Sequence, residues 1–230
     1  MPLGPRPAVS MDVPPYGLSG TLYGALLNHQ SALQALGETI NHPPYQRAPQ
    51  APVLYLKPRN TLAACGEPVT VPPGVAELEI GATLGLVIGR SACRLSEERA
   101  LEHLAGYLIV NDVSIPHQPY YRPSIRFKAR DGFCPLGPRV VPRAAIANPD
   151  SLTLRVYLDG ELKQTATTAQ LVRPVAKLLA DVTDFMTLSP GDVLTVGAGA
   201  PAPRARAGQV ARIEIDGLGR LENPFVDSAA

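Results

Sequence analysis

A segment near the middle of the chain concentrates side chains that could hold an anion and move a proton. It contains two carboxylates, two phenols, a guanidinium and an ammonium group: Asp112, Tyr120, Tyr121, Arg122, Lys128 and Asp131. Such residues usually lie at the surface unless they have partners. Apolar runs precede and follow them, at positions 108–110 and 135–138. The pattern therefore predicts a polar site that is lined by the ends of strands and binds an anionic ligand.

Side-chain chemistry suggests a role for each member of this segment. Arg122 can grip a carboxylate with two parallel hydrogen bonds, and Lys128 can pair with one as a point charge. Proton transfer needs a group that gives up a proton and a group that accepts it. We therefore take Lys128 and Asp131 as candidate catalytic residues, and Arg122, Tyr121 and Asp112 as candidate substrate-binding residues.

The same residues also have purely structural interpretations. Asp112 could be a strand-end carboxylate bonded to the amides of a turn. Lys128 or Arg130 could form an internal ion pair with Asp131. The two tyrosines could pack against the core with a hydrogen-bonded tip. The residue types alone leave these alternatives open.

The elements that must position this segment are mostly short strands punctuated by glycine and proline. Apolar runs and alternation predict strands over 21–27, 53–56, 82–88, 107–110, 152–158, 193–196 and 210–215. Helical spacing predicts short helices over 29–38, 96–105 and 172–186, with Ser96 as an N-cap and Gly106 ending the second helix. We expect a mostly β fold with about three short helices.

Bulk composition narrows the classes of function. The chain has 230 residues, 45% of them hydrophobic and 18% charged, and a formal net charge of +1. This balance argues against a nucleic-acid or membrane-surface role carried by net charge. Cys65, Cys93 and Cys134 lack metal-type spacing, so we expect reduced thiols and a cytoplasmic protein. Prolines crowd residues 1–19, which we predict to be a flexible leader before one domain over 20–230.

Motifs in a fixed order resemble the fumarylacetoacetate hydrolase family over roughly residues 20–226. They are Ile88-Gly89-Arg90, Asn111-Asp112-Val113-Ser114, Lys128 with Asp131, Pro135-Leu136-Gly137-Pro138, Leu158-Asp159-Gly160-Glu161, Pro190-Gly191-Asp192-Val193 and Gly217-Leu218-Gly219-Arg220-Leu221-Glu222-Asn223. Any one motif is weak, but the ordered set is specific. The resemblance implies the mixed β-roll of the family's C-terminal domain.

Further motifs resemble one branch of that family, the bifunctional isomerase/decarboxylases of 4-hydroxyphenylacetate catabolism. They are Leu56-Lys57-Pro58-Arg59-Asn60-Thr61, Cys65-Gly66-Glu67-Pro68, Tyr121-Arg122-Pro123 and Arg130-Asp131-Gly132-Phe133-Cys134-Pro135, and they match the N-terminal half of a duplicated fold. The implied substrates are 5-carboxymethyl-2-hydroxymuconate and 5-oxopent-3-ene-1,2,5-tricarboxylate. The implied partner is a second, paralogous copy of the fold.

The resemblance also implies a divalent metal, usually Mg²⁺, held by two glutamates one residue apart and by the aspartate at Asp112. An oxygen-only ligand set of this kind suits Mg²⁺. Counting back from Ile88 places the glutamate positions on Gly81 and Thr83, which carry no carboxylate. A set made of Glu77, Glu79 and Asp112 would need a four-residue slip of a buried strand, and burial opposes such a slip. We therefore predict no metal ligands at this site.

Two more departures from the family pattern point the same way. The family's lid helix carries a His-x-x-Glu pair, and those positions are Ala32 and Ala35 here, although His29 and Glu38 flank them. The family's Gly-Thr-Pro near the last strands is replaced by Gly197-Ala198-Gly199. The sequence thus predicts a degenerate metal site in a subunit of an isomerase/decarboxylase. The alternatives are a non-catalytic structural partner of a catalytic paralogue, and a stand-alone metal-dependent hydrolase of acylpyruvates.

Overall fold

The computed structural model describes residues 20–117 and 124–228. The α-helices in these residues are α1 (Gln30–Leu36), α2 (Glu97–Ala100), α3 (Ile125–Lys128) and α4 (Val175–Phe185). The strands are β1 (Leu22–Leu26), β2 (Val53–Lys57), β3 (Leu62–Ala63), β4 (Val69–Val71), β5 (Leu78–Glu79), β6 (Ala82–Ile88), β7 (Leu104–Asn111), β8 (Cys134–Pro135), β9 (Val141–Pro142), β10 (Thr153–Leu158), β11 (Glu161–Thr167), β12 (Val193–Thr195), β13 (Arg204–Ala205), β14 (Val210–Ile215) and β15 (Gly219–Asp227). The prediction of a mostly β fold with few short helices is confirmed.

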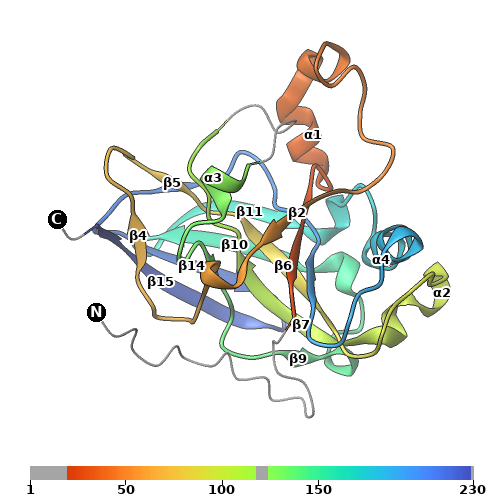
Figure 1. Ribbon diagram of the computed structural model, residues 1–230. Coiled ribbons are helices and arrows are strands. Elements are labelled where there is room, and N and C mark those ends of the chain that lie inside the picture. Colours follow the sequence, from red (N-terminus) through yellow and green to blue (C-terminus); the bar gives the residue numbers. More distant parts are fainter. Residues whose placement is uncertain (1–19, 118–123, 229–230) are drawn as a thin grey trace.

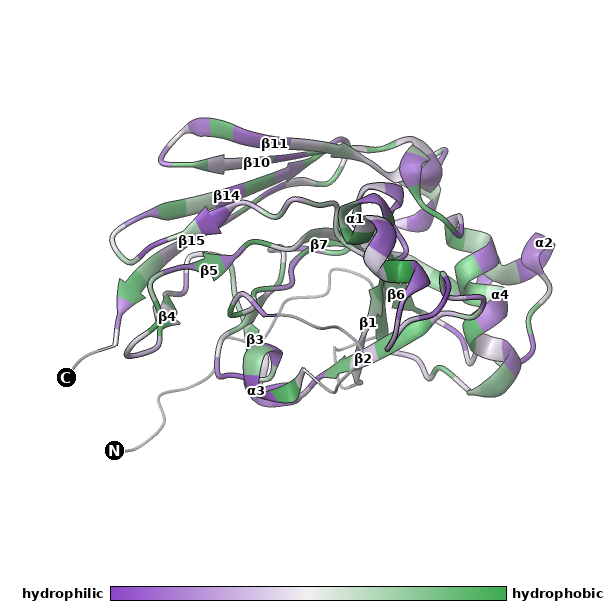
Figure 2. Cartoon of the chain, turned by 90° about the horizontal axis from the view of Figure 1, so that it is seen from above, coloured by the Kyte–Doolittle hydropathy of each residue, from purple (hydrophilic) through white to green (hydrophobic). Residues whose placement is uncertain are grey.

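Two larger sheets and two short ribbons make up the architecture. One sheet has the order β2-β1-β12-β6-β7-β9, and the other has the order β11-β10-β14-β15-β4. The pairs β1–β12 and β15–β4 are parallel, whereas their neighbours are antiparallel, so both sheets are mixed. Figure 2 shows β10, β11, β14 and β15 side by side in one layer, with β1, β2 and β6 across from them.

Strand β6 lies at the centre of the packing, and all seven of its residues are buried. Leu84 and Leu86 belong to the main core between the sheets, whereas Val87 belongs to a second cluster on the opposite face. Side chains of a strand point alternately to its two faces, so a strand covered on both faces reads as a continuous apolar run. The prediction of a buried strand over 82–88 is confirmed.

The second predicted helix is shorter than expected, and Gly106 does not end it. The helix covers Glu97–Ala100 and continues as a 3₁₀ turn over Leu101–His103, and Ser96 precedes it without a side-chain capping bond. Gly106 lies inside β7, where an added Cβ would come within 2.1 Å of the Val141 carbonyl oxygen. The glycine is therefore there because a neighbouring strand passes close to the backbone.

Turn chemistry located the hairpin at residues 159–160 correctly, but the strands after two turns were missed. Asp159 and Gly160 both have positive φ, as the tight turn between β10 and β11 requires. Residues 161–167 and 219–227 carry no clear strand pattern, because many of them are polar and face solvent. Helix α3 was missed as well, since a single turn of helix has no periodicity to detect. The predicted leader over 1–19 lies outside the described residues.

Candidate functional site

A cavity of about 330 Å³ is lined by residues of β1, β2, α1 and α3 and by the segments that follow β7 and β12. In Figure 1, α1 stands at the top of the molecule above β1. The polar wall of the cavity consists of Tyr55 of β2, Lys128 of α3, three residues that follow β7 (Asp112, Ser114 and His117), and Glu79 and Arg204. A second wall is built from small and apolar residues of α1 and of the loop after β12: Ala32, Ala35, Leu36, Ala198, Gly199 and Ala200.

Asp112 is the centre of charge on the polar wall. It follows the last residue of β7 and is 7% exposed. The Lys128 ammonium donates to its Oδ2 at 2.6 Å, and the Lys57 ammonium lies 2.9 Å from its Oδ1. The Tyr55 hydroxyl donates to the same Oδ2. The carboxylate is therefore bound by two cations and a phenol, so its interpretation as a carboxylate bonded to turn amides is wrong.

Lys57 is a buried lysine that connects several segments of the site. The residue is 1% exposed, and its ammonium donates to the carbonyl oxygens of Val113, Lys128 and Phe133 at 2.7, 2.9 and 2.8 Å. An ammonium group has three protons, and all three are used in this way. The contact with Asp112 Oδ1 at 2.9 Å is therefore an attraction between charges without hydrogen-bond geometry. Lys57 thus joins β2 to the end of β7, to α3 and to the loop before β8.

Tyr55 lies on the same face of β2 as Lys57, since the two are separated by two positions. Its ring covers Gly24 on β1, where an added Cβ would meet the ring at 2.0 Å. The Lys128 ammonium lies 4.8 Å from the centre of this ring. Burial raises the pKa of Tyr55 well above its usual value, and the negative charge of Asp112 raises it further. The phenol is therefore protonated and serves as a hydrogen-bond donor.

Electrostatics fixes the charge of Asp112. Burial alone would raise the pKa of this carboxyl, but the ammonium groups of Lys128 and Lys57 hold the pKa well below its usual range. Burial lowers the pKa of Lys57, and the negative charge of Asp112 opposes that shift. Burial raises the pKa of the neighbouring Cys134 thiol to about 12, so this cysteine is a neutral core residue. The described centre is an ionised carboxylate between two ammonium groups.

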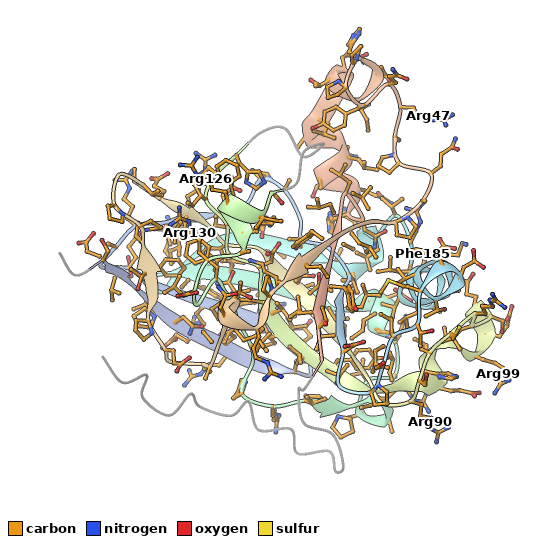
Figure 3. All side chains as sticks on the ribbon, viewed as in Figure 1. Arg47, Arg90, Arg99, Arg126, Arg130 and Phe185 are labelled. Carbon is orange, nitrogen blue, oxygen red and sulfur yellow. The ribbon has the colours of Figure 1, made fainter. Side chains whose placement is uncertain are left out.

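The structure brings some of the predicted site residues together and separates others. Lys128 and Asp112 meet in the cavity. Asp131 is exposed outside it, and its carboxylate accepts a hydrogen bond from Asn60 at 2.6 Å. The proposed ion pair between Lys128 or Arg130 and Asp131 is therefore wrong: Lys128 pairs with Asp112, and Arg130 donates to the Arg126 carbonyl oxygen at 3.2 Å. Figure 3 labels both arginines.

Three other predicted residues, Tyr120, Tyr121 and Arg122, lie outside the described residues. Their assignment to substrate binding or to packing stays a prediction.

The two positions that the family resemblance assigns to metal-binding glutamates lie beside Asp112. Gly81 is directly opposite Asp112, whose amide donates to the Gly81 carbonyl at 2.9 Å. An added Cβ at Gly81 would come within 2.4 Å of the Asp112 carbonyl oxygen. Thr83 is buried, and its hydroxyl donates to the Gly197 carbonyl at 3.0 Å. Neither position offers an oxygen to the cavity in the way a glutamate would.

The alternative glutamates do not complete a metal site either. Glu79 lines the cavity, but its carboxylate contacts Arg204 at 3.4 Å and accepts from the Ser114 hydroxyl at 3.4 Å. Glu77 lies away from the cavity and pairs with Arg206 at 2.7 Å. Glu79 bridges to Ser114 in the same register that places Gly81 opposite Asp112.

Ala32 and Ala35 of α1, where the family resemblance implies a His-x-x-Glu pair, both line the cavity. His29 instead caps α1: its Nδ1 accepts from the Ser31 hydroxyl at 2.8 Å, and its Nε2 lies 3.3 Å from the Thr167 carbonyl oxygen. Burial lowers the pKa of His29, and the hydrogen bond to the Thr167 carbonyl partly opposes the shift.

Three residues of the site were missed by the sequence analysis. Tyr55 and Lys57 alternate with leucines along β2, and this period of two was the available signal. His117 follows a loop and lines the cavity, stacked on Phe127 with ring centres 4.7 Å apart. Its Nδ1 lies 2.8 Å from the Ile115 carbonyl oxygen, so Nδ1 carries a proton. No sequence pattern marked His117, because its position depends on the fold.

Comparison with known proteins decides the family. The family model of the fumarylacetoacetate hydrolase C-terminal domain matches residues 21–226. The chain belongs to the fumarylacetoacetate hydrolase family. Within that family it is 40% identical over 210 residues to the 4-hydroxyphenylacetate degradation bifunctional isomerase/decarboxylase of Escherichia coli, a match that covers 91% of this chain and 48% of that protein. The chain therefore spans about half the length of the curated relatives it matches.

Solved structures of the fumarylacetoacetate hydrolase family share the fold. The 5-carboxymethyl-2-hydroxymuconate delta-isomerase of Mycobacterium smegmatis superposes with a TM-score of 0.79 and 29% identity, over 93% of this chain and 81% of that chain. Fumarylpyruvate hydrolase of Pseudomonas aeruginosa, in complex with Mn²⁺ and pyruvate, superposes with a TM-score of 0.82 over 99% of this chain and all of that chain. At 22% identity, this second likeness concerns the fold alone.

The solved fumarylpyruvate hydrolase of Pseudomonas aeruginosa holds Mn²⁺, and the residues around Asp112 offer such a cation a poor set of donors. Both oxygens of Asp112 face ammonium groups, and Gly81 and Thr83 supply no carboxylate. The chemistry of this donor set suits an anion, since its net charge is positive. Separately, none of the described helices has the length and apolarity needed to span a membrane.

Proposed function

We propose that this chain is a subunit of an isomerase/decarboxylase of 4-hydroxyphenylacetate catabolism and that its cavity binds a small anionic 2-oxo or 2-hydroxy acid. The proposed substrates are 5-carboxymethyl-2-hydroxymuconate and 5-oxopent-3-ene-1,2,5-tricarboxylate. The observation that carries the proposal is the Lys128 ammonium, which faces the cavity and is held by Asp112 at 2.6 Å. The identity of 40% to the Escherichia coli enzyme supports the choice of substrates.

One stabilising group can serve both reactions. Loss of CO₂ from the tricarboxylate and the proton shift of the muconate both place negative charge on the oxygen of a conjugated 2-oxo acid. A fixed cation at that oxygen stabilises the developing charge without reorganising during the reaction. Lys128 is fixed in this sense, because Asp112 and the Tyr55 ring both contact its ammonium.

Proton transfer needs a second group in the same cavity. Asp112 is a poor base there, since two ammonium groups hold its pKa well below the usual range. His117 also lines the cavity, and imidazole is the side chain that most often carries protons in enzymes. We assign proton transfer in the isomerisation to His117 and charge stabilisation to Lys128.

The subunit role rests on length and on what the cavity lacks. The curated relatives are about twice as long as the matched region, so their remaining half has room for a second copy of the fold. The small residues Ala32, Ala35 and Gly81 supply no acid, base or ligand to this cavity. We therefore propose that metal-dependent steps take place in a paralogous subunit. The free thiols of Cys65, Cys93 and Cys134 are in keeping with a cytoplasmic location.

The test is to assay the purified chain with each substrate, alone and with the paralogous subunit. The proposal expects isomerisation to depend on Lys128 and to fall at least about a hundredfold in Lys128→Met, the usual loss when a transition-state donor is removed. Full turnover of both substrates by the Lys128→Met complex would refute it.

A second candidate function is that of a non-catalytic partner that completes an oligomer. The alanine-lined wall favours this alternative, because it carries no group that could react. Under this alternative the chain would stabilise the paralogous subunit, and Lys128→Met would leave the kinetics of the complex unchanged. The hydrolase alternative has no comparable support, since Glu77 pairs with Arg206 outside the cavity.

A further inference from the structure

We propose that the cavity binds a small polycarboxylate through Lys128 without any divalent cation, because the two lysines on Asp112 supply the positive charge that a metal would otherwise bring. The inference deepens the proposed function and rests on its assignment of the cavity as the substrate site. It concerns binding alone, so it can fail or hold whatever the chain catalyses.

Both carboxylate oxygens of Asp112 are already occupied. Lys57 lies 2.9 Å from Oδ1 and Lys128 lies 2.6 Å from Oδ2, so each carboxylate oxygen has its own ammonium group. Mg²⁺ requires several oxygen ligands at about 2.0–2.1 Å in octahedral geometry. A cation at that distance from either oxygen would lie against an ammonium group and be repelled by it. Asp112 is therefore not available as a metal ligand while both lysines are charged.

Positive charge remains at the site. Asp112 with Lys57 and Lys128 carries one net positive charge, in a place where the protein screens it less than water does. Lys57 uses all three of its protons on backbone carbonyls, but the Lys128 ammonium has one hydrogen-bond acceptor among the described residues, Asp112. Its capacity for further acceptors faces the cavity. An anionic oxygen is the acceptor that such a group binds best.

The remaining cavity is small. At about 330 Å³ it lies at the small end of the range for ligand sites. Arg204 lines it as well, and its side chain is 53% exposed, with Glu79 at a long 3.4 Å. A ligand with one carboxylate at Lys128 and another at Arg204 satisfies both cations. The site therefore fits a small di- or tricarboxylate.

Calorimetric titration of the full chain with oxalate tests the inference. The chain is treated with a chelator, and oxalate is added in the presence of EDTA and again in the presence of Mg²⁺ or Mn²⁺. We expect the affinity for oxalate to agree within about twofold between the EDTA and the metal conditions. In Lys128→Met we expect the affinity for oxalate to fall at least about tenfold, because a charged hydrogen-bond donor is removed. Oxalate binding that requires the metal, or no oxalate binding at all, would overturn the inference.

Two further variants keep the test decisive. Lys128→Met removes one of the two cations at buried Asp112 and could impair folding. The double variant Lys128→Met/Asp112→Asn therefore removes the Asp112 carboxylate charge together with the Lys128 ammonium. It should fold and still fail to bind oxalate. Lys177→Met is the matched control, because Lys177 is a half-exposed lysine of α4 that contacts Asp181 and does not line the cavity. Unchanged binding in the double variant would overturn the role of Lys128.

These measurements separate the inference from the proposed function. Metal-free oxalate binding without turnover of either substrate refutes the enzymatic role and leaves the inference standing. Turnover of the substrates together with oxalate binding that requires a metal supports the enzymatic role and refutes the inference.

Discussion

Replacing Lys57 by methionine tests whether one buried ammonium group organises the site. Lys57 donates to the carbonyl oxygens of Val113, Lys128 and Phe133 and lies 2.9 Å from Asp112 Oδ1. Methionine fills a similar volume but donates no hydrogen bond. The substitution therefore leaves a buried carboxylate with one cation fewer and removes the donor that joins four parts of the chain.

The expected loss in the free energy of unfolding follows from the burial of Asp112 and from Lys128, the cation that still contacts it. Removing one member of a buried ion pair costs about 3–5 kcal/mol. Because Lys128 still contacts Asp112, we expect the lower end, a fall of about 3 kcal/mol in the free energy of unfolding. For a chain of this length, that corresponds to a fall of roughly 6–12 °C in Tm. The loss is a large part of the roughly 5–15 kcal/mol that stabilises a typical folded protein.

Equilibrium unfolding in urea, followed by circular dichroism, measures the change. The control is Lys163→Met, since Lys163 is a partly exposed lysine on β11 that contacts Glu161 at 2.7 Å, and we expect it to change stability by less than about 0.5 kcal/mol. Adding Asp112→Asn to Lys57→Met should recover part of the loss, because no unbalanced charge then remains. A loss below about 1 kcal/mol in Lys57→Met would refute the reasoning, since the ion pair and its hydrogen bonds would then contribute little.

Four further predictions concern the surroundings of the site. The pKa of Asp112 is depressed in the folded chain, so the unfolded chain takes up the proton first. The stability from its ion pairs is present above about pH 4 and lost as the pH falls further, and Asp112→Asn should flatten acid unfolding curves over that window. The pKa of His29 is lowered by burial, so stability should fall as the pH drops below about 6.5, and His29→Gln should remove that part of the pH dependence of the urea midpoint. Gly81→Ala should cost about 1–3 kcal/mol by thermal unfolding, because the added Cβ would meet the Asp112 carbonyl oxygen; an unchanged Tm would show that the strands can part. Asp131→Ala should leave oxalate affinity unchanged within about twofold, since the carboxylate lies outside the cavity and contacts Asn60, and a loss of binding would relocate the site.

Sequence patterns located the elements of the fold better than the partners of the polar residues. Strand β6 could be predicted because both of its faces are buried, which leaves an unbroken apolar run. The end of the second helix could not be predicted from Gly106, because this glycine lies where β9, which is distant in sequence, passes close to the backbone. Strand β15 was missed because its outward residues are polar and its partner β4 is far away along the chain. Local patterns report burial, whereas pairing depends on distant segments.

The same contrast between local patterns and distant partners holds for the single side chains of the site. Asp112 and Lys128 were predicted as members of one site, since both lie in a short polar segment between two apolar runs. Lys57 comes from a strand more than fifty positions earlier, and its role depends on three carbonyl oxygens that no residue type could reveal. Where the family resemblance implies two glutamates beside the Asp112 carboxylate, the chain has Gly81 and Thr83, and two ammonium groups contact it instead. That arrangement is the basis of our proposal that the cavity binds an anion.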